Sequence, residues 1–122
     1  MPIKVLLADD SDAIHRAIER HLKFEPEIEL VGQAKGFQEA VRLVRELSPD
    51  VVILDLRMTA ALDADDDGIR QICNCWTIAI SVSVDGETVA LFEKLNADAF
   101  IDKMYLGEKL IPTILELAGR PS

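Results

Sequence analysis

Carboxylate side chains follow two apolar stretches of the chain. Asp9 and Asp10 come directly after the run 3–8, and Asp55 comes directly after the run 51–54. The run 51–54 has no polar residue, and three of its four side chains are β-branched, which is typical of a strand buried on both faces of a parallel sheet. Ligands bind at the edge where the carboxyl ends of such strands meet. The sequence therefore predicts three carboxylates at one ligand-binding edge.

A hydroxyl and an amine are expected at the same edge. Ser81 lies at the end of the apolar segment 77–82, and Lys103 ends the segment 99–103. Each of these positions is the carboxyl end of a predicted strand, as are the positions of the carboxylates. A carboxylate cluster with a nearby lysine and serine has the chemistry to bind a cation and an anionic group together.

The elements that position these residues alternate between strand and helix five times. Such alternation predicts an α/β fold, a doubly wound parallel sheet with helices on both faces and right-handed crossovers. The expected strands are 3–8, 28–34, 51–55, 77–82 and 99–103. The expected helices run from Ser11 to before Pro26, over 37–47, over a short stretch of about two turns at 69–76, over 85–95, and through 110–118 to Gly119.

The first helix has a clear apolar stripe and a predicted cap. Ser11 is a plausible N-cap, and His15 and His21 are expected on opposite faces because they lie six residues apart. The predicted apolar positions of this helix are Ala13, Ile14, Ala17, Ile18 and Leu22.

Composition limits the classes of function. The chain has 122 residues, which suits a single domain with a core of its own, and its net charge of -9 argues against binding of nucleic acid or anionic membranes by this domain. No stretch approaches the roughly 20 apolar residues of a membrane span, and the start of the chain has no signal-peptide layout. A cytoplasmic location is expected.

Two other groups of potential metal ligands are weaker signals. Cys73 and Cys75 are interpreted as small thiols, because no further cysteine is present to complete a zinc site. The stretch 63–68 matches the first half of a calcium-binding loop, but Asn74 stands where the bidentate carboxylate is needed. An acidic loop in solvent is the preferred interpretation.

With these residues in place, the chain resembles the receiver domain of bacterial two-component response regulators over essentially its whole length. The segments 3–10 and 54–58 are most similar to receivers that carry a helix-turn-helix output domain. The resemblance implies a flavodoxin-like, five-stranded parallel sheet of order 2-1-3-4-5 with a shortened third helix. It rests on Asp9, Asp10, Asp55, Ser81 and Lys103.

The resemblance also implies roles for these residues. Asp55 would accept a phosphoryl group from a phosphohistidine on a partner histidine kinase. Asp10, Asp55 and the backbone carbonyl of Arg57 would bind Mg²⁺, with Asp9 holding the ion through water. The physics agrees, because unit charges 4 Å apart repel by about 4 kcal/mol at an effective dielectric near 20, and Mg²⁺ favours carboxylate and phosphate oxygens.

Three further implications concern switching and partners. Lys103 and Ser81 would contact phosphoryl oxygens, and Phe100 matches the family's aromatic switch, although a plain core aromatic explains that residue equally well. A homodimer and a DNA-binding output domain in the full-length protein are also implied.

The sequence departs from the family pattern at four places. Thr59 stands where proline is usual, Val82 where a small residue is common, and Met104 where a cis-forming proline is frequent. The usual Asp-Gly pair is displaced to 67–68. These departures predict an altered loop over 59–76, which we interpret as a flap beside the phosphorylation site. Val82 is expected to narrow the access to that site.

Two alternatives remain beside the phosphorylated switch. One is a receiver-shaped scaffold that signals without phosphate. The other is a hydrolase that forms an aspartyl-phosphate, which is disfavoured because Arg57 stands where such enzymes place an acid.

Overall fold

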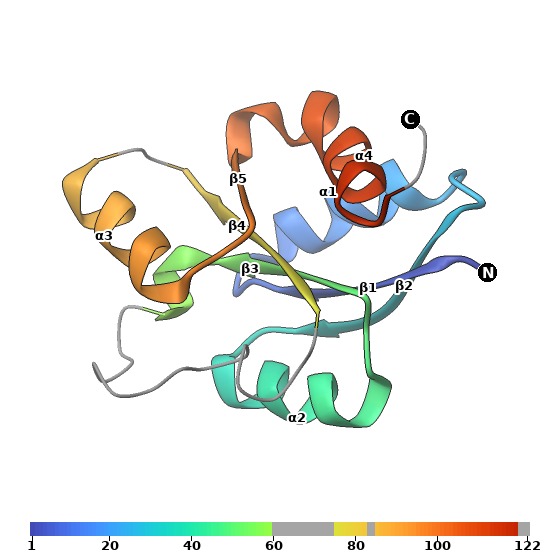
Figure 1. The fold of residues 1–122 in the computed structure, drawn as a ribbon, viewed down its shortest axis with the longest axis horizontal. Helices are drawn as coiled ribbons and strands as arrows, with labels where there is room; N and C mark the ends of the chain where they lie inside the picture. The colour runs from blue at the N-terminus through green and yellow to red at the C-terminus, as the bar shows by residue number, and fades with distance from the viewer. Residues whose placement is uncertain (60–74, 83–84, 120–122) are drawn as a thin grey trace.

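A five-stranded parallel sheet forms the centre of the protein (Figure 1). The computed structural model describes residues 1–59, 75–82 and 85–119. The strand order β2-β1-β3-β4-β5 confirms the predicted flavodoxin-like topology. The strands are β1 (Ile3–Ala8), β2 (Ile28–Ala34), β3 (Val51–Asp55), β4 (Trp76–Ser81) and β5 (Ala99–Asp102).

Helices cover both faces of this sheet. The described helices α1 and α4 pack on one face, and α2 and α3 pack on the other (Figure 1). They are α1 (Asp12–Leu22), α2 (Phe37–Leu47), α3 (Gly86–Leu95) and α4 (Leu106–Leu117), with the short 3₁₀ segments η1 (Leu56–Thr59) and η3 (Lys103–Tyr105).

Strand β3 lies in the middle of the sheet and contributes to both cores. Its residues alternate, so that Val51 and Ile53 join the core under α1 and α4, while Val52 and Leu54 join the core under α2 and α3. All four are fully buried, which confirms the prediction of a strand covered on both faces. Asp55 therefore follows directly on a fully buried segment of the sheet.

Local sequence signals fix the start of two helices beside the functional edge. Ser11 caps α1, as predicted, by accepting a hydrogen bond from Ile14 N at 3.3 Å. Asp85 caps α3 in the same way by accepting from Thr88 N at 2.8 Å, and this bond lowers the pKa of the exposed Asp85 carboxyl. Both helices thus begin at defined positions next to strand ends.

The element boundaries differ from the sequence predictions in three places. Trp76 opens β4 instead of closing a helix, and the strand ends at Ser81, which leaves Val82 outside it. Lys103 lies in η3, one residue beyond β5. Helix α4 begins at Leu106, ahead of the predicted apolar stretch, and contains Pro112.

Several predictions fall wholly or partly on residues that the structure does not describe. The calcium-like stretch 63–68, most of the predicted short helix 69–76 and most of the predicted flap lie in the range 60–74, outside the described residues. Thr59 is described and does not belong to a loop, because it is buried in η1 with its hydroxyl donating to Leu56 O at 2.6 Å. Cys75 is disulfide-bonded, so its interpretation as a thiol was wrong.

The helices of the described residues are short relative to a bilayer. None of them combines the length and the apolar character that crossing a membrane requires.

Candidate functional site

The predicted site residues come together at the carboxyl edge of the sheet. Asp9 follows β1, Asp55 ends β3, Ser81 ends β4 and Lys103 follows β5. Strand register aligns these ends, since Ala8 pairs with Leu54 and Ser81 pairs with Asp102. Oxygen atoms of Asp9, Asp10 and Asp55 lie within 4.8 Å of one another.

Asp9 is completely buried, and its side chain is held in one orientation. Its Oδ1 accepts a hydrogen bond from Ser11 N at 2.8 Å. Its Oδ2 is buried without a hydrogen-bond partner of good geometry among the described residues, and Lys103 Nζ lies 2.8 Å from it. The Lys103 ammonium group is therefore the cationic partner of this buried oxygen.

Asp55 is 1% exposed and faces the same ammonium group. Its Oδ1 accepts a hydrogen bond from Arg57 N at 3.1 Å, and its Oδ2 lies 3.6 Å from Lys103 Nζ. Burial and the neighbouring Asp9 carboxylate raise the pKa of Asp55, although Lys103 and the Arg57 amide oppose the shift. One lysine therefore serves two buried carboxylates, and the edge carries unbalanced negative charge.

The donor set suits a hard divalent cation. The carboxylates of Asp9, Asp10 and Asp55 supply only oxygen atoms, which Mg²⁺ prefers, and Asp10 is exposed and faces solvent. The charge balance agrees, because a single ammonium group, Lys103 Nζ, faces the buried carboxylates of both Asp9 and Asp55. The residues fit the predicted metal site.

A family comparison agrees with this arrangement. The family model described as "Response regulator receiver domain" matches residues 5–115 of the chain. The chain belongs to the response regulator receiver family. It is a receiver domain of the two-component systems, as the sequence predicted.

Individual relatives of this receiver differ in the length and kind of their full chains. The present receiver is 34% identical over 89 residues to the transcriptional regulatory protein LiaR of Bacillus subtilis. This match covers 71% of the present chain and 42% of LiaR. The receiver is 30% identical over 124 residues to a protein-glutamate methylesterase/protein-glutamine glutaminase of Methanococcus maripaludis, covering 92% of this chain and 34% of that protein. The receiver thus spans less than half the length of either relative.

A solved structure has the same fold. The response regulator domain of Thermotoga maritima CheB matches the receiver with a TM-score of 0.81 and 24% sequence identity, and the match covers 100% of both chains.

Ser81 lies at the carboxyl edge of the sheet, beside a small recess. It is 2% exposed and lines a cavity of about 90 Å³. The other described lining residues are Leu56, Arg57, Asp85, Glu87, Thr88 and Leu91. Val82, which was expected to narrow the access, is 59% exposed and is not among these described lining residues.

Phe100 lies on β5, beneath helix α3 of the receiver. Its half-buried ring makes a T-shaped contact with Phe92, with ring centroids 6.1 Å apart and an interplanar angle of 87°. An apolar cavity of about 220 Å³ opens beside the two rings and is also lined by Thr88 and Val89. The ring is therefore packed on one side and has free space nearby.

Sequence reasoning missed the part that His15 plays in this receiver. His15 is 5% exposed, whereas Ala13, which was assigned to the apolar face, is exposed. The buried residues of α1 are His15, Ile18 and Leu22, at spacings of three and four. That spacing was visible in the sequence and could have placed His15 on the inner face.

The raised pKa of Asp55 predicts a measurable effect on stability. Between the ordinary carboxyl pKa and the raised one, the folded state binds more protons than the unfolded state, so the free energy of unfolding of the metal-free receiver falls as pH rises. We expect Asp55→Asn to raise Tm at pH 7 by a few degrees, because about 1 kcal/mol corresponds to roughly 4 °C in a domain of this size. Thermal unfolding in a chelator measures this difference.

The pH dependence provides the control for that measurement. The advantage of Asp55→Asn should shrink as pH falls through the raised pKa of Asp55, where Asp55 itself becomes protonated. The exposed Asp50, at the opposite end of β3, provides a matched substitution, and Asp50→Asn should not raise Tm. Equal Tm values for Asp55→Asn and the wild type at pH 7 would contradict the assigned charge imbalance.

Proposed function

We propose that residues 1–122 form a single receiver domain in which Asp55 accepts a phosphoryl group from the phosphohistidine of a partner histidine kinase. The observation that carries this proposal is the position of Asp55. Its buried carboxylate lies within 4.8 Å of the other two carboxylates and 3.6 Å from Lys103 Nζ. An anionic nucleophile beside a mobile cation suits attack on a phosphoryl group.

The transfer exchanges one bond to phosphorus for another. The Asp55 carboxylate forms a bond to phosphorus while the bond to the kinase imidazole breaks, and the imidazole leaves with the electron pair. Lys103 would then move from the carboxylates to a phosphoryl oxygen, and the Ser81 hydroxyl would donate to another. The buried positions of both side chains at the same edge support these roles.

Asp9, Asp10, Asp55 and the Arg57 carbonyl would hold Mg²⁺. When bound, this ion supplies the positive charge that allows a phosphoryl group to approach three carboxylates. The three carboxylates within 4.8 Å of one another, faced by the single ammonium group of Lys103, support this assignment. The protein would act on no substrate other than its own phosphoryl group, so we do not regard this domain as an enzyme.

The signal would leave the site through Ser81 and Phe100. Movement of the Ser81 hydroxyl towards the phosphoryl group would free space beneath α3, and the cavity beside Phe100 offers room for the ring to reorient. This geometry favours the switch role of Phe100, which the sequence left open against a core role.

The remaining proposals concern the cell and the full-length protein. We place the domain in the cytoplasm, together with its kinase. LiaR is named as a transcriptional regulatory protein, which supports a DNA-binding output domain in the full-length protein. The homodimer is proposed from the family resemblance alone. A net charge of -9 supports the view that this domain itself binds neither DNA nor membranes.

Incubation with Mg²⁺ and a small acyl-phosphate donor tests the proposed function. Intact-mass measurement should show one added phosphoryl group, and a chelator should prevent the addition. A protein that remains unmodified under these conditions, and also with its kinase, would contradict phosphoryl acceptance and would favour the phosphate-independent scaffold.

Lys103→Ala should separate phosphorylation from switching. We expect the variant to accept the phosphoryl group, because Asp55 and the metal ligands remain, but to lose most of the conformational change that follows. Hydrogen exchange of β4 and β5, compared with and without phosphorylation, measures that change. The exposed Lys109, which lies 5.4 Å from the Tyr105 ring centroid, provides the control Lys109→Ala. A normal phosphorylation-dependent change in Lys103→Ala would exclude Lys103 as the coupling residue.

A further inference from the structure

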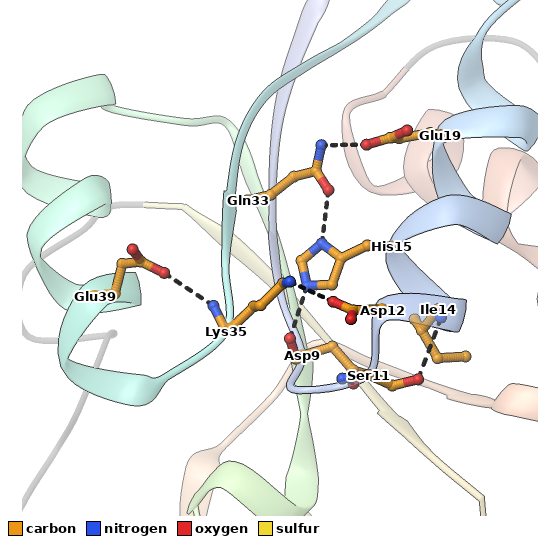
Figure 2. A network of polar contacts seen from close by, with 9 residues as sticks. All are labelled: Asp9, Ser11, Asp12, Ile14, His15, Glu19, Gln33, Lys35 and Glu39. Carbon is orange, nitrogen blue, oxygen red and sulfur yellow. Dashed lines mark hydrogen bonds and ion pairs between the residues drawn. The ribbon is translucent and has the colours of Figure 1, made fainter.

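A hydrogen-bonded network joins α1 and β2 to the backbone of Asp9 (Figure 2). His15 Nε2 lies 2.7 Å from the Asp9 carbonyl oxygen, and His15 Nδ1 lies 2.7 Å from Gln33 Oε1. Gln33 Nε2 in turn donates to Glu19 Oε1 at 2.6 Å. Because the Asp9 carbonyl and the Gln33 amide oxygen both only accept, each ring nitrogen must carry a hydrogen for the two bonds to form together. Gln33 holds the other ring nitrogen and sets the tilt of the ring.

This network completes the fixation of Asp9. Its N–H donates to Ala34 O at 3.0 Å, its Oδ1 accepts from Ser11 N at 2.8 Å, and its carbonyl accepts from His15. The N–H, the carbonyl and Oδ1 of Asp9 are therefore held by the backbone and by His15, while Oδ2 faces Lys103 Nζ at the carboxylate cluster. The role of His15 in this arrangement is to hold the carbonyl.

The Asp9 carbonyl also determines where Asp10 points. The carbonyl and the amide of Asp10 belong to one planar peptide unit, so fixing the direction of the carbonyl fixes the plane from which Asp10 departs. Asp10 is exposed, and its side chain has less packing to hold it than that of Asp9. Its placement depends on this backbone anchor.

We propose that His15 is a positioning residue of the metal-binding edge, which holds the 9–10 peptide so that Asp10 and Asp9 Oδ2 face the same point. The proposal rests on the proposed metal site. Hydrogen-bond partners of metal-binding groups typically contribute about 10–100-fold to metal affinity. We expect His15 to contribute at the lower end of that range, because it acts through the backbone.

Two substitutions of His15 separate its two hydrogen bonds. The amide nitrogen of a glutamine reaches about as far as Nε2, whereas that of an asparagine reaches only as far as Nδ1. His15→Gln should therefore keep the bond to the Asp9 carbonyl, and His15→Asn should lose it. Gln33→Ala is a third variant, which should fold readily because Gln33 is exposed, and it releases the ring from its second anchor.

Calorimetric titration of Mg²⁺ at one fixed pH provides the first measurement. We expect His15→Asn to weaken affinity by about 10-fold, His15→Gln to stay close to the wild type, and Gln33→Ala to show a smaller loss. Lys35→Gln is the matched control, because it removes the neighbouring ion pair between Lys35 and Asp12. Both side chains of that pair are exposed, so the substitution should leave Mg²⁺ affinity unchanged.

Hydrogen exchange of the metal-free protein provides a second measurement that needs no ion. The amides of Asp10 and Ser11 should exchange faster in His15→Asn than in His15→Gln at comparable Tm. Equal Mg²⁺ affinity and equal amide exchange in all variants would overturn the positioning role. The same holds if both His15 variants lose Mg²⁺ affinity equally and in proportion to a loss of Tm. A wild type that binds no Mg²⁺ would refute the metal site, while the exchange comparison would still decide the role of His15.

Discussion

Asp55→Asn should reduce phosphoryl incorporation into this receiver to the detection limit. The substitution keeps the shape of the side chain but replaces an anionic oxygen with an amide, which is not a nucleophile at neutral pH. The other charged groups at the edge, Asp9, Asp10 and Lys103, remain in place. Loss of labelling would therefore identify the acceptor and not a general collapse of the site.

Intact mass after incubation with Mg²⁺ and an acyl phosphate measures this effect. Asp50→Asn is the matched control, because Asp50 is an exposed aspartate just before the other end of β3 and accepts a hydrogen bond from Lys4 N at 2.9 Å. It should be labelled like the wild type. Labelling of Asp55→Asn at the rate of the wild type would refute the assignment of the acceptor.

Asp10→Asn should weaken Mg²⁺ binding more than Asp9→Asn. The charge of Asp9 is already paired with Lys103 Nζ at 2.8 Å, whereas Asp10 is exposed at the cluster and is expected to contact the ion directly. We expect a loss of roughly 100-fold or more for Asp10→Asn, because a unit charge about 4 Å away is worth several kcal/mol at an effective dielectric near 20. For Asp9→Asn we expect about 10-fold, as for a residue that acts through water.

Calorimetry is the appropriate measurement for this comparison. Trp76 opens β4, five residues before Ser81, so its indole begins roughly 16 Å from the site and is a poor reporter of metal binding. Asp12→Asn provides the control, because this exposed carboxyl is paired with Lys35, which lowers its pKa, and it lies outside the cluster. Equal losses for Asp9→Asn and Asp10→Asn would contradict the proposed order of contact.

The sequence alone determined the sheet and the membership of its functional edge. The run Val51–Leu54 could only be a strand covered on both faces, because it offers no polar side to solvent. The residue after such a strand must lie at an edge of the sheet, and the same reasoning applied independently to Asp9, Ser81 and Lys103. Local patterns were sufficient to predict these positions, since a continuous apolar run indicates a buried strand and the polar residue after it marks the end of that strand.

The tertiary structure decided which hydrogen-bond and ion-pair partners each polar atom at that edge has. The spacing of His15 permitted an inner position, but its partners come from β1 and β2, and only strand pairing brings Asp9 O and Gln33 to one imidazole. Lys103 reaches Asp9 and Asp55 across the ends of four adjacent strands, β5, β4, β3 and β1, a relation that no sequence separation expresses. The charge balance of the site depends on distances between strand ends, and those distances exist only after the sheet has formed.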